Sequence, residues 1–287
     1  MSLTTNNNTI NIGFSPCPND TFIFDALVQK KIDTTPFDFK YQLEDVETLN
    51  NWALEGKLPV TKISYNTFLK ATDKYFLLDS GSALGNGVGP LLISTEKAPE
   101  EYLLKESIRD ARIAIPGKNT TANLLFSLAF PEAQHKTEIV FSEIEERVLN
   151  GEFDLGLIIH EGRFTYYERG LQKWMDMGDW WEKETGSAIP LGGICVRKDV
   201  PYEQAKQIEK LIKESIQYSW DRYPELSAFI KEHAQEMEES VMRKHINLYV
   251  NQYTSSLGKD GRKAIDILFR LAKDNDLIPA FPSSVYL

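Results

Sequence analysis

The 287-residue sequence has only two cysteines, Cys17 and Cys195, which lie far apart in the chain. We therefore expect no disulfide framework, and without a Cys-x-x-Cys pair we expect no structural zinc or dithiol redox site. Basic residues are also scarce, because 32 of them against 42 acidic residues give a formal net charge of -10. This charge opposes binding to nucleic acid or to an anionic membrane, and no local basic patch is visible that would override it.

Long hydrophobic runs are missing as well. No stretch approaches the ~20 apolar residues of a membrane span, and the start, MSLTTNNNTINIGF, lacks the basic residues and apolar run of a secretory signal. We therefore expect a cytoplasmic protein. The composition, 42% hydrophobic and 26% charged, is that of an ordinary globular protein, and the length leaves room for two domains with separate cores.

One succession of segments occurs twice in the chain. A short β-branched strand ends in a polar loop and is followed by a helix, a strand, another helix and a strand that stops on a polar residue; the copies span residues 10–64 and 111–160. Strands that alternate with helices favour parallel sheets, whose ligands bind beyond the carboxyl ends of the strands. The pattern thus predicts an α/β protein with two domains and one cleft, and candidate functional residues at the strand ends.

The chain crosses between the two predicted domains at two glycine-rich segments. GSALGNGVGP precedes an apolar strand at 91–94, and IPLGGICVRKD ends the second unit. Glycines such as Gly87 and Gly192 would absorb backbone rotation if the domains close, or they are ordinary turn glycines. After residue 199 the pattern is helical and is expected to pack on the first domain. The predicted domains are a large discontinuous one, 1–93 and 195–287, and a small one, 94–194.

An imidazole stands at the end of the last strand of the second unit, in the string DLGLIIH that ends at His160. Burial beside Ile158 and Ile159 would lower the pKa of His160 below its usual ~6.5, whereas Glu161 would oppose this. His160 is therefore a candidate general base or, alternatively, a structural histidine that caps the strand. The remaining histidines lie in a polar loop or on charged helices and are expected to be structural: His135, His233 and His245.

Two strand-to-helix junctions carry hydroxyl groups. Thr120 and Thr121 open an apolar helix in the second unit, and Ser64 precedes Tyr-Asn-Thr at the matching place in the first unit. Hydroxyls and free backbone N–H groups at a helix start suit a carboxylate or phosphate, and simple N-capping is compatible with that role. We therefore expect these three residues to hold a small anion from both sides of the cleft.

The most unusual string is SPCPNDTF, from Ser15 onward. Two prolines flank Cys17, and Asn19 stands at a helix start, so the backbone is tightly fixed and Ser15 and Asn19 are candidate ligand-binding residues. A nucleophilic Cys17 is a weaker interpretation, because no neighbour in the sequence lowers the pKa of its thiol. Asn86, in the glycine-rich crossing, is a further candidate. That loop lacks the Lys-Ser/Thr of a phosphate loop and precedes a strand, so we do not expect nucleotide binding.

These strings together resemble one family. SPCPNDTF, the KISYNTF strand end, the glycine-rich loop, NTTA, LIIHEGRF and WW followed by IPLGG are similar to the 1,4-dihydroxy-6-naphthoate synthases of the futalosine route to menaquinone. The resemblance covers nearly the whole chain in the same order. SPCPNDTF and IIHEGRF are long enough to be specific. The sister enzyme of that route, chorismate dehydratase, has a similar fold but is not known for SPCPNDTF.

The resemblance implies a fold like the type II periplasmic solute-binding proteins and a lyase reaction. The substrate would be cyclic dehypoxanthinyl futalosine, a carboxylate, cleaved to 1,4-dihydroxy-6-naphthoate with release of dihydroxyacetone and without a metal or redox cofactor. On the family pattern His160 matches the catalytic base, and Ser64, Thr120 and Thr121 match positions that hold the substrate. A carboxylate-binding protein that catalyses nothing, and chorismate dehydratase, are the alternatives; His160 at the cleft favours an enzyme.

Overall fold

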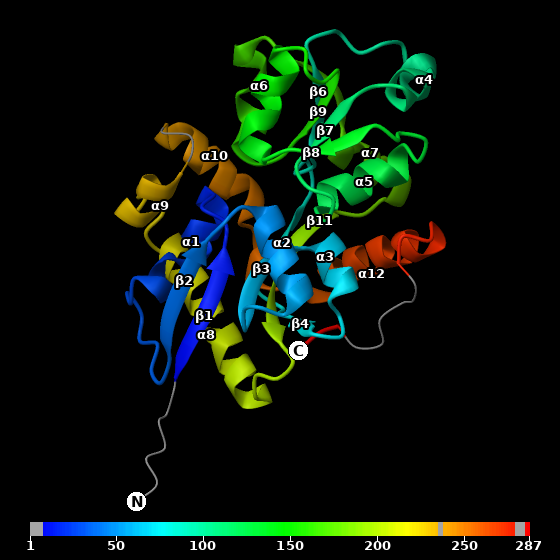
Figure 1. Ribbon diagram of the computed structural model, residues 1–287. Helices are drawn as coiled ribbons and strands as arrows, with labels where there is room; N and C mark the ends of the chain where they lie inside the picture. The colour runs from blue at the N-terminus through cyan, green and yellow to red at the C-terminus, as the bar shows by residue number, and fades with distance from the viewer. Residues whose placement is uncertain (1–7, 235–237, 279–284) are drawn as a thin grey trace, which may run out of the picture.

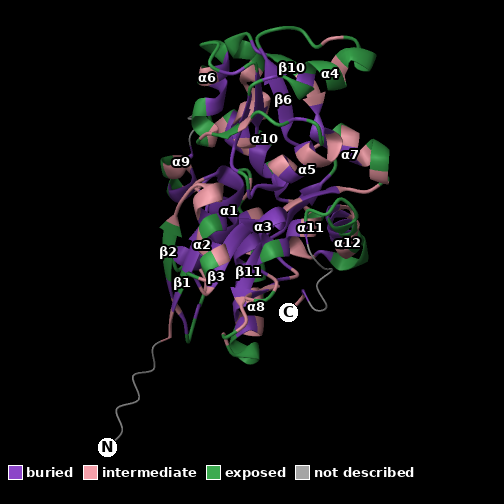
Figure 2. Ribbon diagram, turned by 45° about the vertical axis from the view of Figure 1, so that its right-hand side comes forward, coloured by how far each residue is buried: buried purple, intermediate pink, exposed green. Residues whose placement is uncertain are grey.

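The computed structural model describes residues 8–234, 238–278 and 285–287, and these form two α/β lobes, each built on its own sheet (Figure 1). Figure 2 shows that buried residues follow the sheets and the helix faces packed on them, while exposed residues gather on outer helix faces and loops. No helix in the described ranges has the length and apolar character needed to cross a membrane.

The larger lobe contains a mixed sheet in the order β2-β1-β3-β11-β4, with β5 paired to β11. Its strands are β1 (Thr9–Phe14), β2 (Asp38–Leu43), β3 (Val60–Ser64), β4 (Tyr75–Leu77), β5 (Ala83–Gly85) and β11 (Ile189–Arg197). The first-unit helices are α1 (Pro18–Val28), α2 (Val46–Glu55) and α3 (Tyr65–Lys70). β1 runs parallel to β2 and β3, whereas β11 is antiparallel to β3. The predicted parallel unit is therefore present, and a returning strand extends it.

Local signals explain where the helices of the first unit begin and end. Pro18 occupies the first position of α1, where its missing N–H costs no hydrogen bond. The Asp45 carboxylate caps α2 by accepting hydrogen bonds from the N–H groups of Glu47 and Thr48, and Gly56 ends the helix with φ +73°. These caps place the helix starts next to the carboxyl ends of β1 and β3.

The smaller lobe repeats this arrangement in a sheet of order β10-β6-β9-β7-β8. Its strands are β6 (Leu91–Ser94), β7 (Ile113–Ile115), β8 (Lys136–Glu138), β9 (Leu155–Ile158) and β10 (Gln172–Asp176). Its α-helices are α4 (Leu104–Arg109), α5 (Thr121–Ala129), α6 (Ile144–Leu149) and α7 (Met177–Thr185). Its 3-10 turns are η1 (Glu101–Leu103), η2 (Phe141–Glu143), η3 (His160–Phe164) and η4 (Tyr166–Arg169). β7 is parallel to β8 and β9, so β8-β7-β9 reproduces β2-β1-β3, and the predicted repeat is confirmed.

The C-terminal part of the chain is helical and returns to the larger lobe, as expected. Its helices are α8 (Tyr202–Trp220), α9 (Ala228–His233), α10 (Glu239–Tyr249), α11 (Gln252–Ser255) and α12 (Gly258–Asp274). α8 packs along α1, and its buried stripe includes Ile208, Ile212 and Ile216, at helical spacing. α10 also packs on α1 and reaches η3 of the smaller lobe, so it lies at the junction of the two lobes.

The chain passes between the sheets between β5 and β6 and again between α7 and β11. The predicted domain limits, 93/94 and 194/195, fall inside β6 and β11. The hydrophobic pattern located these strands, but which sheet a strand joins depends on pairing with distant segments. The domain limits stay a prediction, and sheet membership favours exchange points before β6 and before β11.

The two glycines considered as rotation points differ in their surroundings. A Cβ on Gly192 would lie 2.6 Å from the carbonyl oxygen of Ile63, so Gly192 permits the close approach of β11 and β3. Gly87 has φ +66° and no atom within 4 Å of a Cβ, which matches an open turn. Gly192 is therefore a packing glycine, and Gly87 retains space for rotation.

Candidate active site

A largely apolar cavity of about 110 Å³ lies between the two lobes. The larger lobe lines it with Ser15, Asp20, Lys62 and Ser64. The smaller lobe contributes Thr120, Thr121 and His160. Apart from Lys62, which lies inside β3, these residues follow or end the strands β1, β3, β7 and β9, so the cavity lies at the carboxyl ends of the parallel strands, where the topology places ligands.

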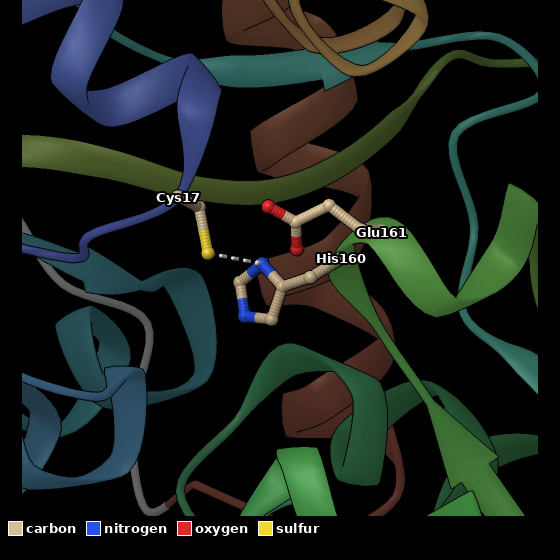
Figure 3. Close-up of side chains that lie close together, drawn as sticks. All are labelled: Cys17, His160 and Glu161. Atoms are coloured by element: carbon tan, nitrogen blue, oxygen red, sulfur yellow. Dashed lines mark hydrogen bonds between the residues drawn. The ribbon is translucent and has the colours of Figure 1, made fainter. Parts of the chain in front are cut away.

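His160 reaches the cavity through an unusual backbone turn. β9 ends at Ile158, Ile159 continues extended, and His160 has φ +64°, a left-handed conformation that few residues other than glycine adopt. Its Nδ1 lies 3.3 Å from the Sγ of Cys17 (Figure 3). Its Nε2 is buried and has no hydrogen-bond partner among the described residues. One ring nitrogen is therefore engaged by the protein, and the other is available to a ligand.

Burial lowers the pKa of His160 to about 4, because desolvation disfavours the imidazolium. The carboxylates of Asp20 and Asp45 oppose this shift, and the Lys62 ammonium adds to it. The ring of Phe141, whose centroid is 4.6 Å from that of the imidazole, contributes to the apolar surroundings. The predicted lowering of the pKa is confirmed, and His160 is neutral at physiological pH.

Cys17 is the N-cap residue of α1, and its thiol is buried. Burial raises the pKa of this thiol well above its usual value, and the charges of Glu161 and Asp20 raise it further, so the thiolate is disfavoured and the nucleophile interpretation receives no support. In Figure 3 the side chains of His160 and Glu161 both extend toward Cys17. The donor atoms of these three residues lie within 4.8 Å of one another, and the expectation that the site holds no metal stays a prediction.

A buried ion pair, which the sequence interpretation missed, lines the same cavity. The Nζ of Lys62 on β3 lies 2.9 Å from Oδ1 of Asp20 on α1, and the two side chains are only 8% and 5% exposed. The Asp20 carboxylate also accepts hydrogen bonds from the Ser15 hydroxyl at 2.8 Å and the Asn19 side-chain amide at 2.8 Å. One signal was available: Lys62 is a charge inside a β-branched strand, two positions before Ser64 and therefore on the same face.

His245, predicted from the sequence to be a structural histidine on a charged helix, also reaches the cavity, and its structural role stays a prediction. It lies on the buried face of α10, is 1% exposed and lines the cavity. Its Nε2 is 3.0 Å from Oδ1 of Asn19, and its Nδ1 is 3.7 Å from Oε1 of Glu161. Because the Asn19 amide nitrogen donates to Asp20, Oδ1 is an acceptor and Nε2 of His245 carries the hydrogen. Burial and the neighbouring His160 lower the pKa of His245 well below its usual value.

The hydroxyl groups of Thr120 and Thr121 are occupied by the protein. The Thr120 hydroxyl donates to the carbonyl of Gly117 at 2.8 Å and accepts from the N–H of Asn123 at 3.2 Å, so it caps α5. The Thr121 hydroxyl donates to the carbonyl of Leu191 at 2.6 Å. The two threonines therefore shape the helix start rather than offer free hydroxyls to a ligand.

Backbone N–H donors remain where the start of α5 borders the cavity. Thr121 and Ala122 occupy the first two positions of α5, where an N–H group has no intrahelical acceptor. The Ser64 hydroxyl accepts from the side-chain amide of Asn50 at 3.1 Å, which leaves its hydrogen for another acceptor. This helix-start end of the cavity suits a carboxylate. Binding of substrate by Ser64, Thr120 and Thr121 stays a prediction.

Asn86 does not reach the cavity. It is exposed and lines a separate hollow with Glu182 and Tyr253, because the turn after β5 carries it outward and Val88 and Pro90 face the cavity instead. Among the other predicted residues, Asn19 lies one layer behind the cavity wall, where it joins Asp20 to His245. The predicted residues that the structure brings to the cavity are Ser15, Ser64, Thr120, Thr121 and His160.

Comparisons with known proteins agree with this architecture. Residues 10–274 match the profile of a family described as menaquinone biosynthesis. A protein of Thermus thermophilus named 1,4-dihydroxy-6-naphthoate synthase is 39% identical over 278 residues, 97% of this chain and 99% of the relative. A protein of Streptomyces coelicolor with the same name is 38% identical over 277 residues, 95% of each chain.

Solved structures show the same fold. A protein from Archaeoglobus fulgidus matches with a TM-score of 0.88 and 31% identity over 95% of this chain and all of its own. The alkanesulfonate-binding protein of Xanthomonas axonopodis matches with a TM-score of 0.72 at 12% identity over 96% of each chain, which shows the fold alone. The predicted two-domain, periplasmic-binding-protein-like fold is therefore confirmed. By the span of the profile and the identity to both named relatives, the chain belongs to the menaquinone-biosynthesis family that includes the 1,4-dihydroxy-6-naphthoate synthases.

Proposed function

We propose that this protein is a carbon–carbon lyase that converts cyclic dehypoxanthinyl futalosine to 1,4-dihydroxy-6-naphthoate, with release of dihydroxyacetone. The two relatives named for this product align with nearly the entire chain. The single observation that carries the proposal is the neutral imidazole of His160, whose Nε2 has no hydrogen-bond partner among the described residues and whose ring borders an apolar cavity.

His160 would act as the general base. With a pKa of about 4 its ring is uncharged near neutral pH. Either the Cys17 thiol or Nδ1 can be the donor in their contact, and the base role requires the tautomer in which Nδ1–H donates to Sγ. That tautomer places the lone pair on Nε2. There it removes a hydroxyl proton from the substrate, the carbon–carbon bond breaks in a retro-aldol sense, and aromatisation of the new ring drives the reaction.

The helix-start end of the cavity would bind the substrate carboxylate. The first N–H groups of α5 and the Ser64 hydroxyl can select an anion locally, even in a protein of net charge -10. Apolar side chains such as Leu49, Ile159 and Leu191 line the space between the polar ends and suit a flat ring. A small-molecule carboxylate is the partner that this geometry favours, and a cytoplasmic location stays a prediction.

Substrate conversion tests the proposal directly. The purified full-length chain is mixed with cyclic dehypoxanthinyl futalosine, and the naphthoate product is followed by absorbance and identified by chromatography, with chorismate in a parallel reaction. We expect catalytic turnover of the first compound and none of chorismate. Saturable binding without product would support a binding protein instead, and formation of an enolpyruvyl benzoate from chorismate would support the dehydratase.

A further inference from the structure

The Lys62–Asp20 pair has no role in the reaction as described so far, although it occupies one end of the cavity. Burying two charges costs solvation free energy that their attraction only partly returns, so a pair of this kind is weak evidence for stability. Its place on the wall of a ligand cavity therefore points to a role in binding or chemistry.

The two members of the pair differ in how fully their hydrogen-bonding capacity is used. The Asp20 carboxylate accepts from the Ser15 N–H and hydroxyl, the Asn19 amide and Lys62, so little capacity remains. An ammonium group has three N–H donors, and in the described part of the chain Asp20 is the one hydrogen-bond acceptor found for Lys62. Two charged donors of Lys62 are thus left for a ligand in the cavity.

Lys62 also lies at the reacting end of the site. It faces the same side of β3 as Ser64, two residues away, so their Cα atoms are about 7 Å apart. That separation matches a bicyclic ring system that places a carboxylate at the helix-start end and an oxygen at the ion-pair end. Both Lys62 and Asp20 act electrostatically on His160, which places them near the imidazole.

Resting on the proposed function, we propose that Lys62 is a further catalytic residue, which donates a hydrogen bond to the carbonyl oxygen of the three-carbon chain that becomes negative during bond cleavage. Asp20 is its positioning residue. In the ring-opened keto form of the substrate, His160 Nε2 takes the proton of the hydroxyl on the ring carbon that carries the three-carbon chain, the O–H electron pair forms a ring carbonyl, and the carbon–carbon bond breaks. Its electron pair moves into the three-carbon chain, whose carbonyl becomes an enolate oxygen beside Lys62, and the imidazolium returns the proton so that this chain leaves as dihydroxyacetone. The ring is left as a 1,4-diketone, which tautomerises to 1,4-dihydroxy-6-naphthoate. No oxidant or reductant is needed.

A preorganised charged donor in a water-poor site stabilises such an oxyanion more than the neutral ketone, so its removal lowers kcat. In Lys62→Gln we expect kcat to fall about 10²- to 10³-fold, as for the loss of an oxyanion-hole donor. The Kd of 1,4-dihydroxy-6-naphthoate, measured by calorimetry, should change by less than about threefold, because its carboxylate binds at the other end. Lys40→Gln is the matched control: Lys40 stands on β2 and pairs with Asp38 on the exposed surface, at 3.1 Å.

Two further variants separate chemistry from folding. Lys62→Gln with Asp20→Asn removes both charges and leaves no unpaired buried ion; it should melt near the wild-type Tm and remain as slow as Lys62→Gln. Lys62→Arg keeps the charge, and its kcat should be at least about tenfold higher than that of Lys62→Gln.

A kcat of Lys62→Gln within threefold of the wild-type value would overturn the catalytic role of Lys62. So would an increase of both KM and the product Kd at unchanged kcat, because that result would make Lys62 the ligand of the carboxylate. Absence of naphthoate formation by the wild-type protein would instead overturn the proposed function, and this inference with it.

Discussion

The two β-α-β-α-β units share a strand order but differ at every strand end that faces the cavity. After the first strand, the larger lobe has the proline-flanked Cys17 at the start of α1, whereas the smaller lobe has Thr120 as the cap of α5. After the third strand, the larger lobe passes from Ser64 directly into α3, whereas the smaller lobe turns left-handed at His160.

This difference shows how a repeated fold acquires asymmetric chemistry. Topology brings the same two strand ends of each unit to one cavity, so position alone makes none of these four ends a base or an anion site. The residue types decide: the smaller lobe supplies the imidazole and the capped helix start, and the larger lobe supplies the thiol that engages the imidazole and the Lys62–Asp20 pair. Each lobe therefore holds part of a site that is complete only when the two meet.

The largest effect is expected from replacement of His160, the residue that breaks the symmetry of the third strand ends. In His160→Asn we expect kcat to fall about 10²- to 10⁴-fold, the usual contribution of a general base. Asparagine tolerates the left-handed backbone at this position, so the change removes the base with little added strain. Steady-state kinetics with cyclic dehypoxanthinyl futalosine measure the loss.

His135→Asn is the matched control, because His135 is exposed in a loop of the same lobe and does not line the cavity. Its kcat should equal that of the wild type. Turnover by His160→Asn at the wild-type rate would show that the imidazole takes no part in the mechanism. The residues at the ends of β3 and β9 would then differ in structure only and not in catalytic role.

The second prediction concerns pH. Because the pKa of His160 is about 4 in the folded protein, kcat/KM should be independent of this group above pH 5 and decline at lower pH as the ring protonates. On unfolding the pKa returns to ~6.5, so the unfolded chain binds more protons between the two values. The contribution of His160 to stability is therefore fully present above pH 6.5 and is lost as the pH falls toward 4.

Urea unfolding at pH 5 and pH 7 measures the stability part of this prediction. The free energy of unfolding should fall more steeply from pH 7 to pH 5 in the wild type than in His160→Asn, which lacks the titrating group. Burial lowers the pKa of His245 as well, so His160→Asn should keep part of the pH dependence of the free energy of unfolding. Identical slopes in both proteins would mean that the imidazole of His160 is solvated in the folded state.

The fold and half of the site could be predicted because their signals are local. The repeat follows from short strand and helix patterns, and His160 follows from one buried strand with a polar end. The contact of Cys17 with His160 joins residues 143 apart, and that of Asn19 with His245 joins residues 226 apart. A single sequence carries no record of such long-range pairing, so the role of Cys17 in holding the imidazole and the burial of His245 could not be foreseen.

Asn86 lies outside the cavity for a different physical reason. A glycine-rich crossing between domains is expected near a cleft, but the direction of its turn depends on backbone dihedrals that the residue types only weakly restrict. Gly87 takes φ +66°, and Asn86 faces solvent on the outer side of that turn. The predicted domain limits depend on the same kind of information, since β6, the strand after the crossing, joins the smaller sheet through pairing with distant segments.

The smallest effect is expected at the first strand ends, where Thr120 can be changed without touching His160. Thr120→Val removes the cap of α5 at nearly constant volume, which should lower the free energy of unfolding by about 1 kcal/mol. If the first N–H groups of α5 hold the carboxylate, their looser alignment should also weaken binding of 1,4-dihydroxy-6-naphthoate about five- to tenfold in calorimetry.

Thr120→Ser keeps the capping hydroxyl and should retain wild-type affinity, and Asn86→Ala, which alters the separate hollow, should do the same. Affinity that stays unchanged in Thr120→Val while its Tm falls would show that the cap only holds the helix in place. The carboxylate would then have to bind at Lys62, and the cavity would be occupied in the opposite direction, with the reacting carbonyl at the start of α5. The paired measurement therefore sets the orientation of the substrate between the two lobes, because each orientation assigns the anion to a different lobe.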